Sequence, residues 1–254
     1  MKVELVIDPP VMNAAGSLGF APELHGPVDL KRLGAFVTNP VSLGARSPAQ
    51  ARGCLPYPGG FLLHSGHANP GLKVVLRRYA GRWRRSSVPV LVHLLGQGTD
   101  ETGRMVRQME GLAGVAGFEL GLPLQADAQT AAGMVAAASG ELPVILRLPL
   151  ERAAELAPDI VASAKGTSLA AFSLGPPRGA LPGLQGELVH GRLYGPAVFP
   201  LALAALHAVR RAGLPVIAAG GIYRPEQVEA LLAAGASAVQ LDTVLWRGGW
   251  WRAD

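Results

Sequence analysis

Short apolar runs rich in β-branched residues alternate with longer amphipathic stretches along almost the whole chain. Eight runs are short enough to be strands: 9–16, 34–38, 89–96, 117–121, 143–150, 169–175, 214–221 and 236–242. Nearly continuous apolar strands are typical of parallel sheets covered on both faces. Eight such units in 254 residues predict an α/β fold, a (β/α)8 TIM barrel, as one domain over residues 1–254. A doubly wound open sheet is the alternative, but it needs fewer units.

Helical periodicity fills most of the intervals between these runs, at 70–85, 100–113, 126–139, 151–164, 198–212 and 225–234. In the last, Pro225 suits a first helical turn and Gly235 suits a left-handed stop. Two intervals, 40–62 and 175–196, are instead rich in proline and glycine. They predict long irregular loops at the carboxyl ends of strands, where barrels build their active sites.

The charge of the chain is basic, with a net charge of +5 and a pI of about 9.8. The densest cluster of arginines lies within 77–85, on a predicted helix. We interpret it as a solvated helix face rather than a nucleic-acid site, which needs basic residues gathered on one binding face.

The single cysteine, Cys54, excludes an intrachain disulfide framework and favours the cytoplasm. Its proline- and glycine-rich surroundings offer nothing to lower its pKa, so we expect a small buried apolar residue. No apolar run reaches the roughly 18–20 residues of a membrane span, and no secretory signal is visible. We expect neither a membrane nor a nucleic acid as partner.

Gly220 and Gly221 end a predicted strand just before the helix that begins near Pro225. Glycine allows close approach of the backbone to an anion, and a helix N-terminus adds free N–H groups. The pattern favours a phosphate site at the end of the barrel where such sites occur. The alternative is that the two glycines only turn a tight corner.

Arg147 interrupts the apolar strand 143–150, so its guanidinium must find a partner at the barrel mouth. An anionic ligand, or the N1–O2 edge of a reduced flavin, would be one partner. A structural ion pair with Glu119 or Asp242 would be another, and the sequence leaves both open.

Histidines gather near the predicted carboxyl ends of strands, at His64, His67 and His93. With Glu119 and Asp242 they could supply metal ligands, but no His-x-His pair lies on one strand, and single histidines at loop ends are usually solvated or hydrogen-bonded. We therefore expect no metal site.

Five segments carry a family resemblance: PVMNAAGSLGF (10–20), GAFVTNPVSLGAR (34–46), LLHSGHANPGL (62–72), GRLYGPAVFPLAL (191–203) and VIAAGGIYRPEQVEALLAAGASAVQLDT (216–243). From residue 10 to about 243, the chain resembles the flavin-containing dihydroorotate dehydrogenases, most closely their soluble class. The resemblance implies a barrel, FMN held at the strand carboxyl ends, and oxidation of dihydroorotate to orotate in pyrimidine biosynthesis.

The resemblance also implies FMN contacts, by position, at Ala15, Gly16, Thr38, Asn39, Arg147, Gly195, Gly220, Gly221, Asp242 and Thr243. Asn39 stands where the family has a lysine that touches flavin and substrate. Arg147 replaces a lysine near flavin N1 and keeps its charge. Asp242 replaces a glycine whose amide meets the phosphate, and a carboxylate there would repel that group. The retained Gly-x-x-Asn-Pro-Gly implies substrate contacts at Gly66, His67 and Asn69.

The substrate side departs from the family. Leu63, His93 and Gly121 replace asparagines, the catalytic Cys or Ser is missing from ELGLP (119–123), and FSLGPP (172–177) lacks an Asn-Thr pair. Losing a general base slows proton abstraction by roughly 10²–10⁴-fold. The resemblance therefore implies an altered substrate, with Arg147 supporting the reduced flavin and His64, His67 or His93 as the replacement base.

Three functions stay open. The first is a dihydroorotate dehydrogenase-like FMN oxidoreductase with a small-molecule substrate, which passes electrons to a soluble acceptor or a separate electron-acceptor subunit, because no iron–sulfur cysteine set is present. The second is a non-catalytic barrel homologue that acts as a binding or regulatory partner. The third and weakest is a metal-dependent hydrolase or lyase. Trp246, Trp250 and Trp251 would form an interface, as in a homo-oligomer, or a lid over the barrel.

Overall fold

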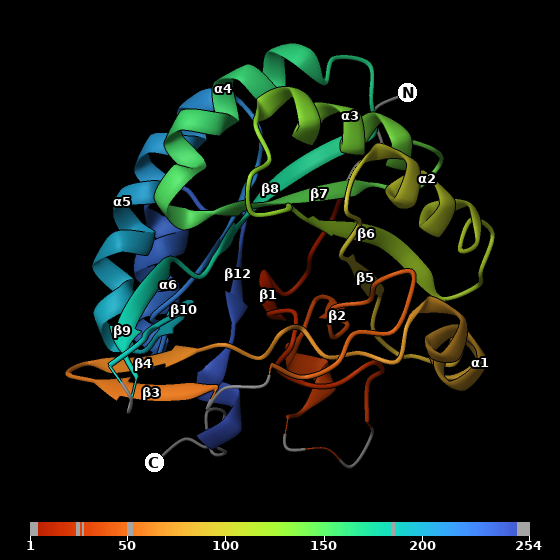
Figure 1. Cartoon of the computed structure of the whole chain (residues 1–254). Coiled ribbons are helices and arrows are strands. Elements are labelled where there is room, and N and C mark those ends of the chain that lie inside the picture. Colours follow the sequence, from red (N-terminus) through yellow and green to blue (C-terminus); the bar gives the residue numbers. More distant parts are fainter. Residues whose placement is uncertain (1–4, 24–25, 27, 50–52, 184–185, 248–254) are drawn as a thin grey trace.

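The computed structural model describes residues 5–23, 26, 28–49, 53–183 and 186–247. An eight-stranded parallel sheet curls into a nearly closed barrel, with strand order β1-β12-β11-β8-β7-β6-β5-β2 (Figure 1). A parallel bridge between Met12 and Ala35 joins its two ends. The strands are β1 (Val11–Asn13), β2 (Phe36–Val37), β5 (Val90–Leu94), β6 (Val115–Gly121), β7 (Val144–Pro149), β8 (Leu169–Gly175), β11 (Val216–Ala219) and β12 (Ala238–Leu241). The predicted TIM barrel is confirmed, since each predicted strand overlaps one of these.

Helices cover the outside of the barrel (Figure 1). They are α1 (Leu72–Trp83), α2 (Thr99–Arg107), α3 (Ala128–Ala138), α4 (Ala153–Ser163), α5 (Phe199–Val209) and α6 (Pro225–Ala233). All six predicted helices are present. Helix α2 ends earlier than predicted because Gly111 and Gly114 adopt left-handed φ angles of +76° and +95°, which an α-helix does not accommodate.

Local signals at two helices agree with the structure. Pro225 begins α6, and Gly235, two residues beyond its end, has a φ of +99°. On α1 and just after it, Arg77, Arg78, Arg84 and Arg85 are exposed, as a solvated helix face requires. That this face binds no nucleic acid stays a prediction. No helix in the described residues combines the length and apolar character that crossing a membrane requires.

The two proline- and glycine-rich intervals are irregular only in part, contrary to the prediction: 40–49 contains no strand or helix, but most of 54–62 and of 178–194 does form strands. These strands form a second, antiparallel sheet of order β3-β4-β10-β9. Its strands are β3 (Cys54–Tyr57), β4 (Gly60–Leu63), β9 (Arg178–Pro182) and β10 (Leu188–Tyr194). Leu63 pairs with Arg192, so the sheet depends on a long-range contact that no local pattern reveals. Pro56 and Pro182 lie on the two edge strands, where a missing N–H is tolerated.

Two further predictions concern single side chains. Cys54 is exposed rather than buried, because edge strand β3 alternates between exposed and partly buried residues. Trp246 is 53% exposed, and its indole N–H donates to the carbonyl of Ser17 at 3.0 Å. Trp250 and Trp251 lie outside the described residues.

Candidate functional site

A buried carboxylate, Glu119, forms a polar network inside the barrel. Its Oε2 lies 2.6 Å from His93 Nδ1 and 3.3 Å from Arg147 Nη1. Its Oε1 accepts hydrogen bonds of 2.7 Å from Ser173 Oγ and from Gln240 Nε2. Four strands besides its own therefore donate to one side chain that is 0% exposed.

The strand periodicity of two explains how this network arises. An apolar layer fills the barrel interior with Met12, Ala35, Val37, Leu91, Ile145, Ala171, Ile217 and Ala238. Two residues further along four of the strands, the same face carries the polar residues His93, Arg147, Ser173 and Gln240. The network thus lies one layer nearer the barrel mouth than the apolar layer.

Electrostatics fix the protonation states in this network. Burial alone would raise the pKa of Glu119, but the Arg147 charge and the hydrogen bond from His93 hold it well below its usual range. Burial lowers the pKa of His93, against the opposing effect of Glu119. An ionised Glu119 can only accept, so a neutral His93 donates from Nδ1 and keeps a lone pair on Nε2.

The ion pair between Arg147 and Glu119 settles one of the alternatives that the sequence left open for Arg147. Ser173 and Gln240 were missed from the sequence, although each is a lone polar residue in an apolar strand. Gln240 Oε1 is the one buried side-chain nitrogen or oxygen atom without a hydrogen-bond partner among the described residues.

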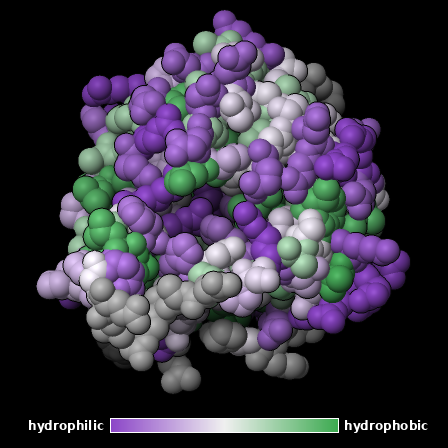
Figure 2. Space-filling model, in the orientation of Figure 1, coloured by the Kyte–Doolittle hydropathy of each residue, from purple (hydrophilic) through white to green (hydrophobic). Residues whose placement is uncertain are grey.

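A cavity of about 1140 Å³ opens at the carboxyl ends of the barrel strands, beside the antiparallel sheet. Figure 2 shows a hollow near the centre of one face, with hydrophilic residues in its depth. Of the sequence-predicted residues, the structure brings together around this cavity Ala15, Gly16, Asn39, His64, Gly66, His67, Asp242 and Thr243. Its size and position are typical of a small-molecule site.

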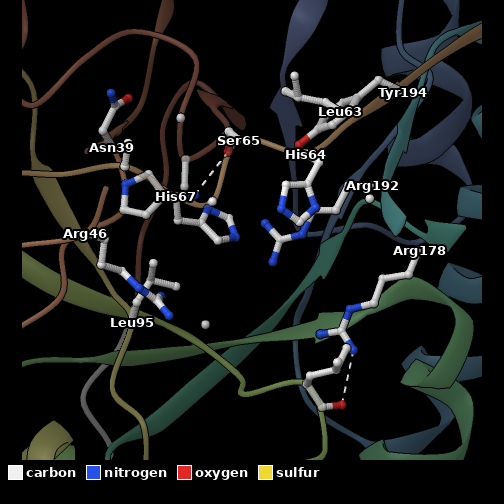
Figure 3. Close-up of a pocket in the computed structure, with 18 of the residues that line it drawn as sticks. Asn39, Arg46, Leu63, His64, Ser65, His67, Leu95, Arg178, Arg192 and Tyr194 are labelled. Atoms are coloured by element: carbon white, nitrogen blue, oxygen red, sulfur yellow. Dashed lines mark hydrogen bonds between the residues drawn. The ribbon is translucent and has the colours of Figure 1, made fainter. Parts of the chain in front are cut away.

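Three arginines that the sequence did not single out also line this cavity, at Arg46, Arg178 and Arg192. Figure 3 shows their side chains around one open space. Arg178 Nε lies 4.0 Å from Glu151 Oε1, whereas no carboxylate in the described part of the chain lies within 4.0 Å of the Arg46 or Arg192 side chain. All three lie in the intervals that were predicted as irregular, which hid them from sequence reasoning.

The histidines at the mouth are not equivalent. Burial and the neighbouring Arg192 lower the pKa of His67 to about 2, so its imidazole is neutral. His64 is exposed, and its Nδ1 lies 2.6 Å from the carbonyl oxygen of His190. In the described ranges, no group of three or more His, Cys, Asp or Glu is arranged to hold a metal ion.

His93 lines a second, smaller cavity of about 20 Å³, together with Arg147. That volume holds about one water molecule. Four residues line both cavities: Gly121, Leu122, Arg178 and Arg192. The free Nε2 of His93 therefore lies close to the large cavity but is separated from it by a shared wall.

Two residues of the predicted site have structural partners instead. Asn69 is buried, and its Oδ1 accepts from the backbone N–H groups of Ser42 and Gly71 at 3.2 and 3.0 Å. Thr38 is buried and accepts the backbone N–H of His93 at 3.1 Å. Neither lines the large cavity.

Gly195, Gly220 and Gly221 are buried and lie behind the wall of the large cavity, not on its surface. A Cβ on Gly221 would clash with the backbone of Phe199, and one on Gly195 with the β3–β4 turn. A Cβ on Gly220 would lie 3.0 Å from Val198 Cγ1. Close packing against the start of α5 and against the β3–β4 turn therefore accounts for glycine at these positions.

The end of β12 carries Asp242 and Thr243, which do line the cavity. The Thr243 N–H donates to Asp242 Oδ1 at 2.5 Å, and Thr243 Oγ1 donates to the same oxygen at 3.1 Å. Burial raises the pKa of Asp242. Ala15, Gly16 and Asn39, which the resemblance assigns to FMN, line the cavity, but the Asp242 carboxylate does not fit the phosphate of FMN.

These features define an α/β barrel with a cavity at its mouth that three arginines line. A family model described as nitronate monooxygenase matches residues 181–246. Three similar proteins are each named dihydroorotate dehydrogenase B (NAD(+)), catalytic subunit. The relative from Desulforudis audaxviator is 32% identical over 94% of this chain and 83% of its own length. Those from Geobacter sp. and Trichlorobacter lovleyi are 30% and 29% identical, over 92% of this chain and 82% and 83% of their own lengths. The chain belongs to the dihydroorotate dehydrogenase family.

Proposed function

We propose that this chain is a dihydroorotate dehydrogenase-like flavin oxidoreductase whose substrate is an organic anion other than dihydroorotate. The observation that carries the proposal is the cavity of about 1140 Å³, where the ends of β1 and β2 face three arginines. This exceeds the usual 300–1,000 Å³ of a single-ligand site, which leaves room for a flavin and a small substrate together. FMN is the flavin that the family resemblance implies.

The unpaired cations indicate an anionic substrate. Partly buried guanidinium groups without carboxylate partners are costly until a ligand neutralises them. Arg46 and Arg192 are in that state. Leu63 and Gly121, which line the cavity, offer no side-chain amides where the family has asparagines. At about 1–1.5 kcal/mol per lost hydrogen bond, these changes select against dihydroorotate.

His93 is our choice for the proton acceptor among the three histidines. Its Nδ1–H is held by Glu119, which orients the ring and leaves Nε2 free to accept a proton. One water in the small cavity would relay that proton from the substrate. Arg147 lines the same cavity and provides fixed positive charge. A bound flavin would supply the two-electron acceptor.

The names of the relatives support a partner as well. They are described as catalytic subunits, which implies a further subunit in those enzymes. By this relation we propose that a separate electron-acceptor subunit reoxidises the present chain.

A non-catalytic binding barrel is the second candidate. The bond between Thr243 N–H and Asp242 favours it, because that bond occupies a donor that the family resemblance assigns to FMN. The two candidates differ in whether the bound ligand undergoes redox chemistry.

The test begins with an absorbance and fluorescence titration of the purified chain with riboflavin and FMN. The flavin-loaded protein is then mixed anaerobically with a panel of mono- and dicarboxylates that includes dihydroorotate, and loss of the visible flavin absorbance is followed. We expect flavin binding and reduction by a member of the panel other than dihydroorotate. Absence of flavin binding, or binding without reduction by any member, would favour the binding barrel.

His93→Gln is expected to slow flavin reduction by roughly 10²–10⁴-fold while flavin affinity stays within about twofold. His207→Gln, an exposed position on α5, is the matched control and should leave the rate unchanged. An undiminished rate in His93→Gln would remove this residue from the mechanism without touching the assignment of the cavity.

A further inference from the structure

Asp242 places a carboxylate at the end of β12, where the family resemblance places the phosphate of FMN. Its Oδ1 accepts both donors of Thr243, the backbone N–H and the hydroxyl. Tyr223 in turn donates its hydroxyl to Thr243 Oγ1 at 2.7 Å, since the Thr243 hydrogen is already directed at Asp242. The chain from Tyr223 through Thr243 to Asp242 leaves Thr243 no donor for an incoming phosphate.

The three glycines whose amides the family resemblance assigns to the phosphate are buried and closely packed. The start of α5 packs on Gly220 and Gly221, and the β3–β4 turn packs on Gly195. None of the three glycines lines the cavity. An anion at this end of the cavity would therefore meet the Asp242 carboxylate without a compensating set of N–H donors, which is unfavourable for a phosphate dianion.

One carboxylate oxygen of Asp242 remains available to accept a hydrogen bond. Both of its hydrogen bonds end on Oδ1, so Oδ2 has no donor in the described part of the chain. Because Asp242 lines the cavity, a ligand can reach it. A neutral hydroxyl group is the natural partner, since it donates one hydrogen bond to a carboxylate and brings no charge.

We propose that Asp242 makes this cavity selective for a flavin whose side chain ends in a free hydroxyl group, as in riboflavin, over one that ends in phosphate. This inference rests on the proposed function, because it assumes that the ring of a flavin occupies the cavity. It reverses one expectation of the family resemblance, namely that the ligand is FMN.

The experiment compares equilibrium dissociation constants for riboflavin and FMN, measured by quenching of flavin fluorescence at fixed ionic strength. We use the wild-type chain, Asp242→Gly, Asp242→Asn and, as a matched control, Asp159→Asn on the exposed face of α4. The wild type should bind riboflavin at least about 10-fold more tightly than FMN, a difference of about 1.4 kcal/mol. Asp242→Gly should tighten FMN binding at least about 10-fold, and Asp159→Asn should change neither ligand.

Asp242→Asn retains the shape of the side chain and removes its charge, so it keeps the test decisive if the glycine variant does not fold. In this variant the dissociation constant for FMN should exceed that for riboflavin by less than about threefold. Tighter binding of FMN than of riboflavin by the wild type would overturn this inference and leave the flavin oxidoreductase intact. Failure of both flavins to bind would overturn both.

Discussion

Charged side chains have partners of opposite charge in the barrel interior, but two of the arginines at the barrel mouth have none in the described part of the chain. Inside, Glu119 receives donors from four other strands, and Arg147 is paired with it. At the mouth, Arg46 and Arg192 have no carboxylate within 4.0 Å in the described residues. The charges of the interior network are balanced without a ligand, whereas Arg46 and Arg192 at the mouth lack carboxylate partners within the described ranges and are available to a ligand.

The largest expected effect is a loss of stability when the carboxylate of the interior network is neutralised. Glu119→Gln leaves Arg147 as a buried cation without its counter-charge, so the free energy of unfolding should fall by about 3–5 kcal/mol. Urea denaturation followed by circular dichroism measures it. Glu155→Gln, an exposed partner of Arg152, should cost no more than about 0.5 kcal/mol. A loss below about 1 kcal/mol in Glu119→Gln would contradict the central role of this carboxylate.

The second effect concerns an arginine at the mouth, whose replacement should not lower the free energy of unfolding, unlike the replacement of Glu119. Burial lowers the pKa of Arg192, and the charges of Arg147 and Arg178 add to this, so its cation is held unfavourably. Arg192→Met should leave the free energy of unfolding unchanged or raised. It should also weaken binding of an aromatic anion, anilinonaphthalene sulfonate, by about 10-fold.

Fluorescence titration of that probe gives the affinity. Arg104→Met, an exposed position on α2, controls for the loss of one positive charge. A destabilised Arg192→Met variant with unchanged probe affinity would make Arg192 a structural residue and remove the contrast between the two regions.

The smallest effect concerns pH. The pKa of His67 is about 2 in the folded chain, against a usual value of about 6.5. Below pH 6.5 the unfolded chain takes up a proton that folded His67 does not, so stability falls as the pH decreases. The shift alone corresponds to a loss of about 2 kcal/mol between pH 7 and pH 5. Because His67 is partly exposed, solvent screening lowers the expected loss to about 1 kcal/mol.

Urea denaturation at pH 7, 6 and 5 measures this loss. In His67→Gln the free energy of unfolding should depend less on pH. His207→Gln, at an exposed position, should retain the wild-type slope. Equal slopes in wild type and His67→Gln would mean that the imidazole charges freely at the mouth.

The barrel was predictable because its signals are local. Each strand shows its apolar run and most helices show their periodicity within about 15 residues, as at Pro225 and Gly235. The antiparallel sheet was not predictable, because it pairs residues that lie far apart in the sequence, such as Leu63 and Arg192. That is also why Arg178 and Arg192, which lie on this sheet, were not singled out from the sequence.

The sequence alone could not decide the role of the glycines at the end of β11. Gly220 and Gly221 fit a phosphate site and a close-packed corner equally well as sequence, since both need the absence of a Cβ. The position of Phe199 against Gly221 shows that packing alone already requires glycine there. Arg147 posed the same kind of ambiguity, and the contact with Glu119 resolved it.

The antiparallel sheet gives the molecule a separable specificity element. Leu63, Arg178 and Arg192 lie on three of its strands and contribute to the cavity wall, yet none lies on a strand of the barrel. Exchange of this sheet between homologues can therefore alter ligand choice while the scaffold that carries the chemistry stays constant.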